Sequence, residues 1–188
     1  MSCAIRSCSA SSRRTSPTTT TIHARTEVDA EAALTVDVQL ACGDRDIPGK
    51  KEIRAWVQLA LEGSGRAPHR NAEIAVRVVD TDEIRSLNKQ YRQKDSATNV
   101  LSFPQGTIDG LPEDERLALG DIVVCAGVVC DEAREQRKSV AEHWGHMLVH
   151  GTLHLLGYDH QTDAEAVEME RLETEILARR GIGDPYAS

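Results

Sequence analysis

Aromatic residues and long apolar runs are scarce in this sequence. Phe, Trp and Tyr together make up 3% of its 188 residues. The longest apolar candidate, LALGDIVVCAGVV, is interrupted by Asp121, and no run approaches the roughly eighteen apolar residues that a membrane-spanning helix needs. The sequence therefore predicts no membrane partner, and its length favours one domain with a buried core.

Paired cysteine motifs are missing as well. The chain has five cysteines, an odd number, and no CxxC pair. Neither a disulfide framework nor a cysteine-based zinc ribbon is therefore indicated. Such cysteine usage is typical of a reducing compartment, so we expect a cytoplasmic protein in which Cys125 and Cys130 are small buried residues.

Acidic residues and large apolar residues are rare at the N-terminal end. Residues 1–27 are rich in Ser, Thr and Arg and have no acidic residue before Glu27. Such a segment cannot bury enough surface to offset the entropy of ordering, so we predict a disordered extension over residues 1–30. Two origins are open: an extended translation start, which we favour, and an organelle transit peptide, which would move the predicted location to an organelle.

The charge is acidic overall but unevenly distributed. The net charge is −8, yet residues 44–94 hold eleven basic and eight acidic residues, whereas residues 95–188 hold seven basic and eighteen acidic residues. The middle segment can face a polyanion while the C-terminal half repels one. Solvated charge without any partner explains the same distribution equally well.

From residue 34 onward, the apolar pattern is that of a folded domain. Alternating or β-branched apolar residues predict strands, and apolar residues at helical spacing predict helices. The strands are expected over residues 34–42, 72–80, 98–104 and 117–126, and the helices over 49–63, 81–92, about 129–156 and 163–181. These elements predict one α+β domain over residues 34–188, with one mixed sheet of about four strands packed with helices.

Four histidines gather near the end of the third predicted helix. His146, His150 and His154 recur every four residues and therefore form one column on a helix. The outer two are about 12 Å apart along the helix axis, so one metal ion cannot bind both. Gly157 ends the helix and turns the chain, which brings His160 back toward the later pair. This geometry selects the pair together with His160.

The predicted site is therefore formed by His150, His154 and His160, on a helix and the turn after it. Three nitrogen ligands with an open fourth position suit a catalytic zinc, although nickel, iron and copper also bind such sites. The same spacing occurs in the metzincin proteases, HExxHxxGxxH, in which the Glu is the general base. Gly151 occupies that position here and has no side chain to take a proton, so peptide hydrolysis by the usual route is not expected.

A second unusual stretch, YRQKDSATNVLSFP, occupies residues 91–104. Together with HGTLHLLGYDH at 150–160 and GDI at 120–122, it resembles the YbeY family of bacterial and organellar endoribonucleases. The family patterns Y-R-x-x-D-x-x-T-[ND]-V-L-S-F-P and H-G-x-L-H-L-x-G-Y-D-H are matched at every fixed position. The resemblance runs from about residue 35 to the end and leaves the first 27 residues outside.

The resemblance implies a single-strand-specific, zinc-dependent endoribonuclease with one zinc ion per chain on His150, His154 and His160. It also implies a functionally important Arg92. Such enzymes act in ribosomal RNA processing, notably at the 3′ end of the small-subunit RNA, and in ribosome quality control. The expected partners are single-stranded RNA, the small ribosomal subunit and its assembly factors. The sequence leaves the oligomeric state open.

The chemistry of these residues agrees with that activity. Zinc polarises a phosphoryl oxygen, and a guanidinium such as that of Arg92 binds two phosphoryl oxygens while staying protonated. His146 is a candidate for proton transfer or for a contact to a ligand, and a structural role is an equal alternative. Asp159 either orients a ligand imidazole or caps the turn. Water and the 2′-hydroxyl of the substrate both remain open as the attacking group.

Two other functions are weighed against this one. The first is a ribosome-assembly or RNA-binding factor whose zinc is mainly structural, which the basic middle segment allows. The second is a metalloprotease, which Gly151 disfavours. For either RNA function, the acidic overall charge predicts weak, salt-sensitive binding by the chain alone.

Overall fold

The computed structural model describes residues 33–44, 46–68, 70–106, 112 and 115–187. The predicted N-terminal extension, residues 1–30, lies outside this part of the chain. The elements follow in the order β1 (Leu34–Leu40), α1 (Lys50–Gly63), β2 (Ala72–Val79), α2 (Thr81–Arg92), β3 (Val100–Pro104), β4 (Leu117–Cys125), α3 (Ala126–Glu135), α4 (Val140–Leu155) and α5 (Asp163–Ala178). Every predicted strand is present, and the fold is the predicted α+β domain.

The four strands form one mixed sheet in the order β1-β2-β4-β3. β1 pairs with β2 and β2 pairs with β4 in parallel, whereas β3 pairs with β4 antiparallel. Parallel neighbours need a crossover connection, and α1 supplies the one between β1 and β2. β3 is thereby an edge strand, which leaves one of its sides free to border a cleft.

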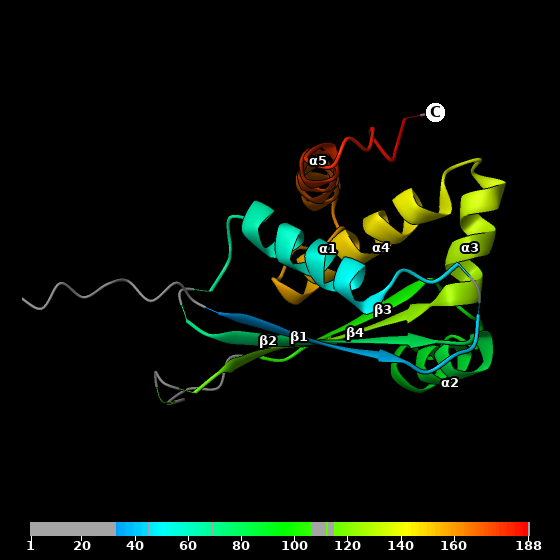
Figure 1. Cartoon of the computed structure of the whole chain (residues 1–188), viewed down its shortest axis with the longest axis horizontal. Helices are drawn as coiled ribbons and strands as arrows, with labels where there is room; N and C mark the ends of the chain where they lie inside the picture. Colours follow the sequence, from blue (N-terminus) through cyan, green and yellow to red (C-terminus); the bar gives the residue numbers. More distant parts are fainter. Residues whose placement is uncertain (1–32, 45, 69, 107–111, 113–114, 188) are drawn as a thin grey trace, which may run out of the picture. The chain divides into compact units, whose positions relative to one another are not determined.

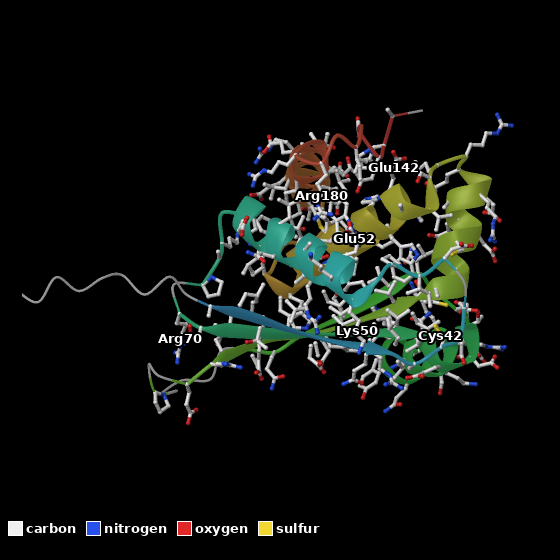
Figure 2. The ribbon with its side chains drawn as sticks, viewed as in Figure 1. Cys42, Lys50, Glu52, Arg70, Glu142 and Arg180 are labelled. Atoms are coloured by element: carbon white, nitrogen blue, oxygen red, sulfur yellow. The ribbon has the colours of Figure 1, made fainter. Side chains whose placement is uncertain are left out.

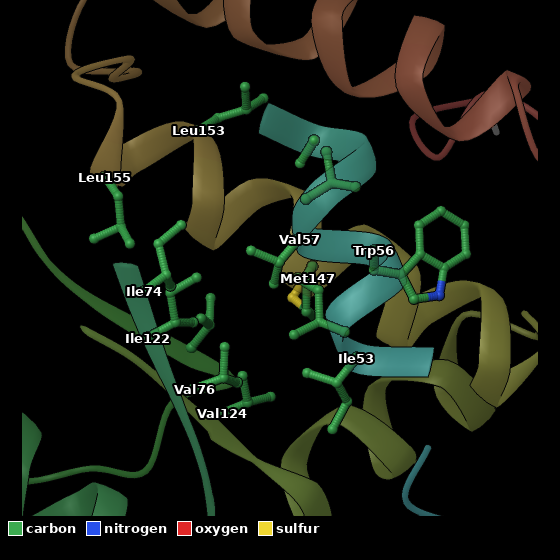
Figure 3. Close-up of a cluster of buried hydrophobic side chains, with 14 of the residues drawn as sticks. Ile53, Trp56, Val57, Ile74, Val76, Ile122, Val124, Met147, Leu153 and Leu155 are labelled. Carbon is green, nitrogen blue, oxygen red and sulfur yellow. The ribbon is translucent and has the colours of Figure 1, made fainter. Parts of the chain in front are cut away.

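Apolar side chains cover both faces of the sheet because successive strand residues point to opposite faces. The larger cluster lies between the sheet and α1 and α4, where Ile74 and Ile122 of the strands meet Val57 and Met147 of the helices (Figure 3). α2 covers the opposite face with a smaller cluster around Ile84. α5 packs on α1 and α4 rather than on the sheet (Figure 1).

The end of α5 is tied to α1 by charged and aromatic contacts. Arg180, just after α5, pairs with Glu52 of α1, and both side chains are labelled in Figure 2. The guanidinium of Arg180 also lies 4.3 Å from the ring centre of Trp56. These contacts add to the packing of α5 on α1 and α4.

The prediction of one long helix over about residues 129–156 is wrong. The segment forms two helices, α3 and α4, separated by residues 136–139. α3 ends because Arg137 takes a left-handed backbone with a φ of 55°, and the N–H of Lys138 donates back to the carbonyl of Ala133 at 2.8 Å. The apolar residues on both sides keep helical spacing, so periodicity alone does not reveal the break.

Cys125 and Cys130 are buried free thiols, as the sequence predicts, and Cys42 is a partly exposed free thiol. Within the described ranges, no helix is both long enough and apolar enough to cross a membrane.

Candidate metal site and cleft

The end of α4 and the turn after it position the three predicted ligands. Gly157 adopts a φ of 79°, and the N–H of Tyr158 donates to the carbonyl of Leu153 at 3.1 Å, which stops the helix as predicted. Tyr158 is buried, and its hydroxyl donates to the carbonyl of Ser64 at 2.6 Å. Arg66 covers the Tyr158 ring at 3.7 Å. The end of α1 therefore anchors the turn that carries His160.

The structure brings His150, His154 and His160 together. One ring nitrogen of each lies within 4.8 Å of the corresponding nitrogens of the other two. The imidazole rings of His150 and His154 have their centroids 4.6 Å apart, and those of His154 and His160 are 5.1 Å apart. The ligand set selected from the spacing is thus one compact cluster.

Hydrogen bonds determine which ring nitrogen of two ligands faces the cluster. Nδ1 of His154 lies 3.0 Å from the carbonyl oxygen of Tyr158, and Nδ1 of His150 lies 2.8 Å from Oε1 of Glu173. A carbonyl and a carboxylate only accept hydrogen bonds, so both Nδ1 atoms carry the hydrogen. In the neutral rings, both Nε2 atoms then present bare lone pairs.

These lone pairs fit a metal ion. The Nε2 atoms of His150 and His154 are 3.1 Å apart, and two bare lone pairs at that distance repel unless a cation lies between them. Two nitrogen ligands of a tetrahedral zinc ion lie about 3.3 Å apart, given bonds of about 2.0–2.1 Å. The spacing of this pair is therefore that of two nitrogen ligands on one metal ion.

The electrostatic environment keeps His154 neutral. Burial, followed by repulsion from the nearby His150 and His160, lowers the pKa of His154 to about 4. Because metal ions bind the neutral imidazole, protons compete little for this ligand at neutral pH.

The histidines border a cleft of about 800 Å³ whose other wall is the stretch at residues 91–104. β3 contributes its alternate residues Val100, Ser102 and Pro104, because these point to the face that carries α4. The loop before β3 contributes Thr98 and Asn99. The two sequence motifs that were singled out separately therefore line one cavity.

Arg92 lines the same cleft, and its role toward a substrate stays a prediction. It is the last residue of α2, which ends where Gln93 takes a left-handed backbone with a φ of 59°. Arg85 and Lys89 pair with Asp95, the one acid of this stretch. Among the described residues, neither Arg92 nor Lys94 has an ion-pair partner, so both charges are available to a ligand.

His146 is not among the residues that line this cleft. It is buried in α4, and its Nε2 lies 2.9 Å from Oε2 of Glu173 and 3.4 Å from the hydroxyl of Tyr186. The structure thus places His146 behind His150, and its role in proton transfer stays a prediction.

Glu173 is the residue that the sequence reasoning missed. It is fully buried, with 0% of its surface exposed. Burial raises its pKa, but the hydrogen bonds from His146 and His150 outweigh burial and bring the pKa to about 2. One signal was available: Glu173 sits in the inward stripe of α5 with Met169 and Ile176, where an acid is out of place.

Asp159 caps the turn. Its carboxylate accepts the backbone N–H of His160 at 2.8 Å and the side-chain amide of Gln161 at 2.6 Å. These bonds, the one from the His160 backbone first, lower the pKa of Asp159. Of the two roles considered for Asp159, the contacts support the turn-capping one.

Gly151 faces the sheet rather than the histidines. A Cβ at this position would lie 2.9 Å from Cγ2 of Ile122 and 3.3 Å from both Oγ of Ser102 and Cγ2 of Val100. The hydroxyl of Ser102 also donates to the carbonyl of Gly151 at 3.0 Å. α4 therefore packs so closely on β3 and β4 that a glutamate has no room here, which further disfavours protease chemistry.

Comparison with known proteins agrees with the motifs. Residues 39–181 match the model of the family described as endoribonuclease YbeY. Endoribonuclease YbeY of Xanthomonas axonopodis pv. citri is 54% identical over 155 residues, which cover 82% of this chain and 94% of that protein. Endoribonuclease YbeY of Colwellia psychrerythraea is 45% identical over 151 residues, which cover 80% of this chain and 96% of that protein.

A solved structure has the same fold. The solution structure of TM1509 from Thermotoga maritima matches with a TM-score of 0.51 and 25% sequence identity, over 82% of this chain and 100% of that chain. The family model covers most of this chain, and the curated relatives are matched over nearly their whole length. The chain therefore belongs to the YbeY family of endoribonucleases.

Proposed function

We propose that this protein is a metal-dependent endoribonuclease that cleaves single-stranded RNA with one zinc ion held by His150, His154 and His160. Membership of the family supports the class, a hydrolase of phosphodiester bonds. The observation that carries the metal dependence is the pair of Nε2 atoms 3.1 Å apart, each with its Nδ1 committed to an oxygen acceptor. Two lone pairs at this distance repel each other, and a cation bound between them removes that repulsion.

The two walls of the cleft have different roles toward a bound phosphodiester: one holds the metal ion and the other supplies positive charge. When bound, zinc supplies Lewis acidity toward a phosphoryl oxygen. The guanidinium of Arg92 binds phosphoryl oxygens through two parallel N–H donors and stabilises the negative charge that grows on them during cleavage. Lys94 adds a second positive charge on the same wall and attracts the neighbouring phosphates of the strand.

The cleft also has groups suited to a single strand. Gln161 lines it, and the carbonyl oxygen of its amide can accept a hydrogen bond from the edge of an unstacked base. An unpaired strand is flexible enough to place one phosphate between the histidines and Arg92. A duplex holds its base edges and backbone in a fixed helical form, so we expect it to be a poor substrate.

The biological setting belongs to the same proposal. We place the enzyme in the cytoplasm, in ribosomal RNA processing at the 3′ end of the small-subunit RNA and in ribosome quality control. The small ribosomal subunit and its assembly factors are the proposed partners. The net charge of −8 supports the need for such partners, because an acidic chain binds RNA weakly by itself.

The test is metal analysis combined with RNA cleavage by the wild type, His154→Ala and Arg92→Ala. We expect one zinc ion per wild-type chain, cleavage of single-stranded RNA, and little cleavage of a duplex of the same sequence. His154→Ala should lose metal and cleavage together, whereas Arg92→Ala should keep the metal and cleave about 100-fold more slowly or worse.

Two outcomes would reject the proposal. If metal-loaded wild type leaves RNA intact, and His154→Ala lowers the melting temperature and ribosome association together, the metal is structural and the protein is an assembly factor. If both variants cleave as the wild type does, the activity comes from a contaminating nuclease.

A further inference from the structure

A buried carboxylate lies directly behind the metal ligands. Glu173 is on the inward face of α5, among the buried apolar residues Met169, Leu172, Ile176 and Leu177. Placing an ionised carboxylate in such surroundings costs several kcal/mol unless hydrogen-bond donors surround it. An apolar residue would fill this position without that cost, so the carboxylate is expected to have a role beyond packing.

Both oxygens of Glu173 are in use. Oε1 accepts from Nδ1 of His150 at 2.8 Å. Oε2 accepts from Nε2 of His146 at 2.9 Å and from the hydroxyl of Tyr186. The donors come from two consecutive turns of α4 and from the segment after α5. Because opposite oxygens are held from different directions, the carboxylate cannot rotate away from His150.

We propose that Glu173 is a positioning residue of the metal site, and that His146 and Tyr186 act through it. Glu173 holds the His150 ring with Nδ1–H toward α5, so that Nε2 points at Nε2 of His154. His146 thereby supports a ligand instead of moving a proton to the substrate. The inference rests on the proposed function, because it presupposes a metal ion on the three histidines.

The segment after α5 is held in place for this task. The backbone N–H of Tyr186 donates to Oδ1 of Asp184 at 2.9 Å, and the ammonium of Lys138 donates to the carbonyl of Pro185. The ring of Tyr186 meets that of His146 edge to face, with centroids 5.5 Å apart. A segment remote from the cleft therefore completes the support of one metal ligand.

The chain contains a matched control for this carboxylate. Glu132 of α3 also accepts from a buried histidine of α4: Nε2 of His143 lies 2.9 Å from its Oε2. Its other donor is the side-chain amide of Asn99, at 3.1 Å and 3.2 Å from the two carboxylate oxygens. Glu132 thus has the same kind of partner as Glu173 but touches none of the three metal ligands.

The experiment compares Glu173→Gln, Glu173→Leu and Tyr186→Phe with Glu132→Gln in the full chain. Zinc affinity is measured by competition with a chromophoric chelator, and the melting temperature is measured without metal. Nitrogen NMR of the metal-free protein reports which nitrogen of His150 carries the hydrogen. This last readout does not depend on activity, and a residue that only supports the fold would not change it.

We expect both Glu173 variants to bind zinc about 10- to 100-fold more weakly, as loss of the partner of a ligand histidine typically does. His150 should become a mixture of tautomers in both. Glu173→Leu should melt below the wild-type temperature without metal, because it leaves the donors of His146 and Tyr186 without their acceptor. Tyr186→Phe should weaken zinc binding by a smaller factor, and Glu132→Gln should bind zinc like the wild type.

The outcomes separate this inference from the proposed function. If Glu173→Gln keeps both wild-type zinc affinity and the wild-type His150 tautomer, the positioning role is wrong while the metal site stands. An equal loss of affinity in Glu132→Gln would also overturn it, because the effect would then be general destabilisation. If the wild type itself binds no zinc, the proposed function and this inference fall together.

Discussion

The two walls of the cleft are built in opposite ways. On the α4 wall, His150 and His154 are partly buried, and each ring is held by an oxygen acceptor at 2.8 Å or 3.0 Å. On the wall from residues 91–104, Arg92 and Lys94 are exposed, and within the described part of the chain neither has an ion-pair partner. The side chains of the α4 wall are therefore held by hydrogen bonds in the absence of a ligand, whereas the cations of the other wall are not held by ion pairs.

The difference fits the ligand proposed for each wall. A zinc–nitrogen bond has a narrow length range of about 2.0–2.1 Å, so its ligands must be placed within tenths of an ångström. Attraction between a guanidinium and a phosphate falls off slowly with distance and tolerates small displacements. A flexible strand also presents its phosphates in varied geometry. Rigid ligands therefore suit the proposed metal ion, and exposed cations suit a proposed RNA substrate.

The largest effect is expected when the rigid wall is broken. His154→Ala removes one of three ligands, so we expect loss of stoichiometric zinc and a drop in cleavage of about a thousandfold or more. Lys94→Ala is the matched change on the other wall. It should keep one zinc ion per chain and lower only the affinity for RNA and its salt dependence. Equal metal loss in the two variants would remove the distinction between the walls.

The next largest effect is expected from Arg92→Lys, which keeps the charge but removes the planar pair of donors. We expect cleavage about tenfold slower or worse, with unchanged zinc content and similar affinity for RNA. Single-turnover cleavage rates and RNA binding at several salt concentrations measure the two quantities separately. A fully active lysine variant would show that this wall supplies charge alone.

A third, smaller effect concerns the contact that holds the rigid wall against the sheet. Gly151→Ala would place its Cβ 2.9 Å from a methyl group of Ile122. Overpacking of this kind costs about 1–3 kcal/mol, whereas better helix propensity gains about 1 kcal/mol. We therefore expect the variant to have a lower free energy of unfolding than the wild type. Chemical denaturation of this variant is compared with that of Gly43→Ala, whose Cβ would meet nothing within 4 Å. A Gly151 variant as stable as the wild type would mean that α4 shifts easily.

The smallest effect is expected from pH in the metal-free protein. His154 has its pKa lowered from 6.5 to about 4, first by burial and then by His150 and His160. Between these values the unfolded chain binds a proton that the folded chain does not, so the free energy of unfolding should fall as pH drops below 6.5. Urea denaturation at pH 7, 6 and 5 measures this slope, which should be shallower in His154→Gln. An identical slope in the variant would assign it to other groups.

The parts of the site that sequence predicted are those set by local spacing. The interval between His150 and His154, together with a glycine that ends the helix, brings His160 back toward the pair, and the end of α1 then anchors that turn. The contact between Glu173 and His150 depends instead on how α5 crosses α4, which no local pattern encodes. The break between α3 and α4 was missed for a related reason, because it depends on one left-handed residue, Arg137.

The close packing at Gly151 has a consequence for protein engineering. The metzincin signature differs from this one at that position by the presence of a glutamate, which suggests a one-letter route from a nuclease to a protease. Here the glycine sets the separation between α4 and the sheet, with Ile122 in contact range of any added carbon. Introducing glutamate at position 151 would also require substitutions in β3 and β4, against which this residue packs. Two proteins can therefore share a metal-binding motif although no single substitution converts the activity of one into that of the other.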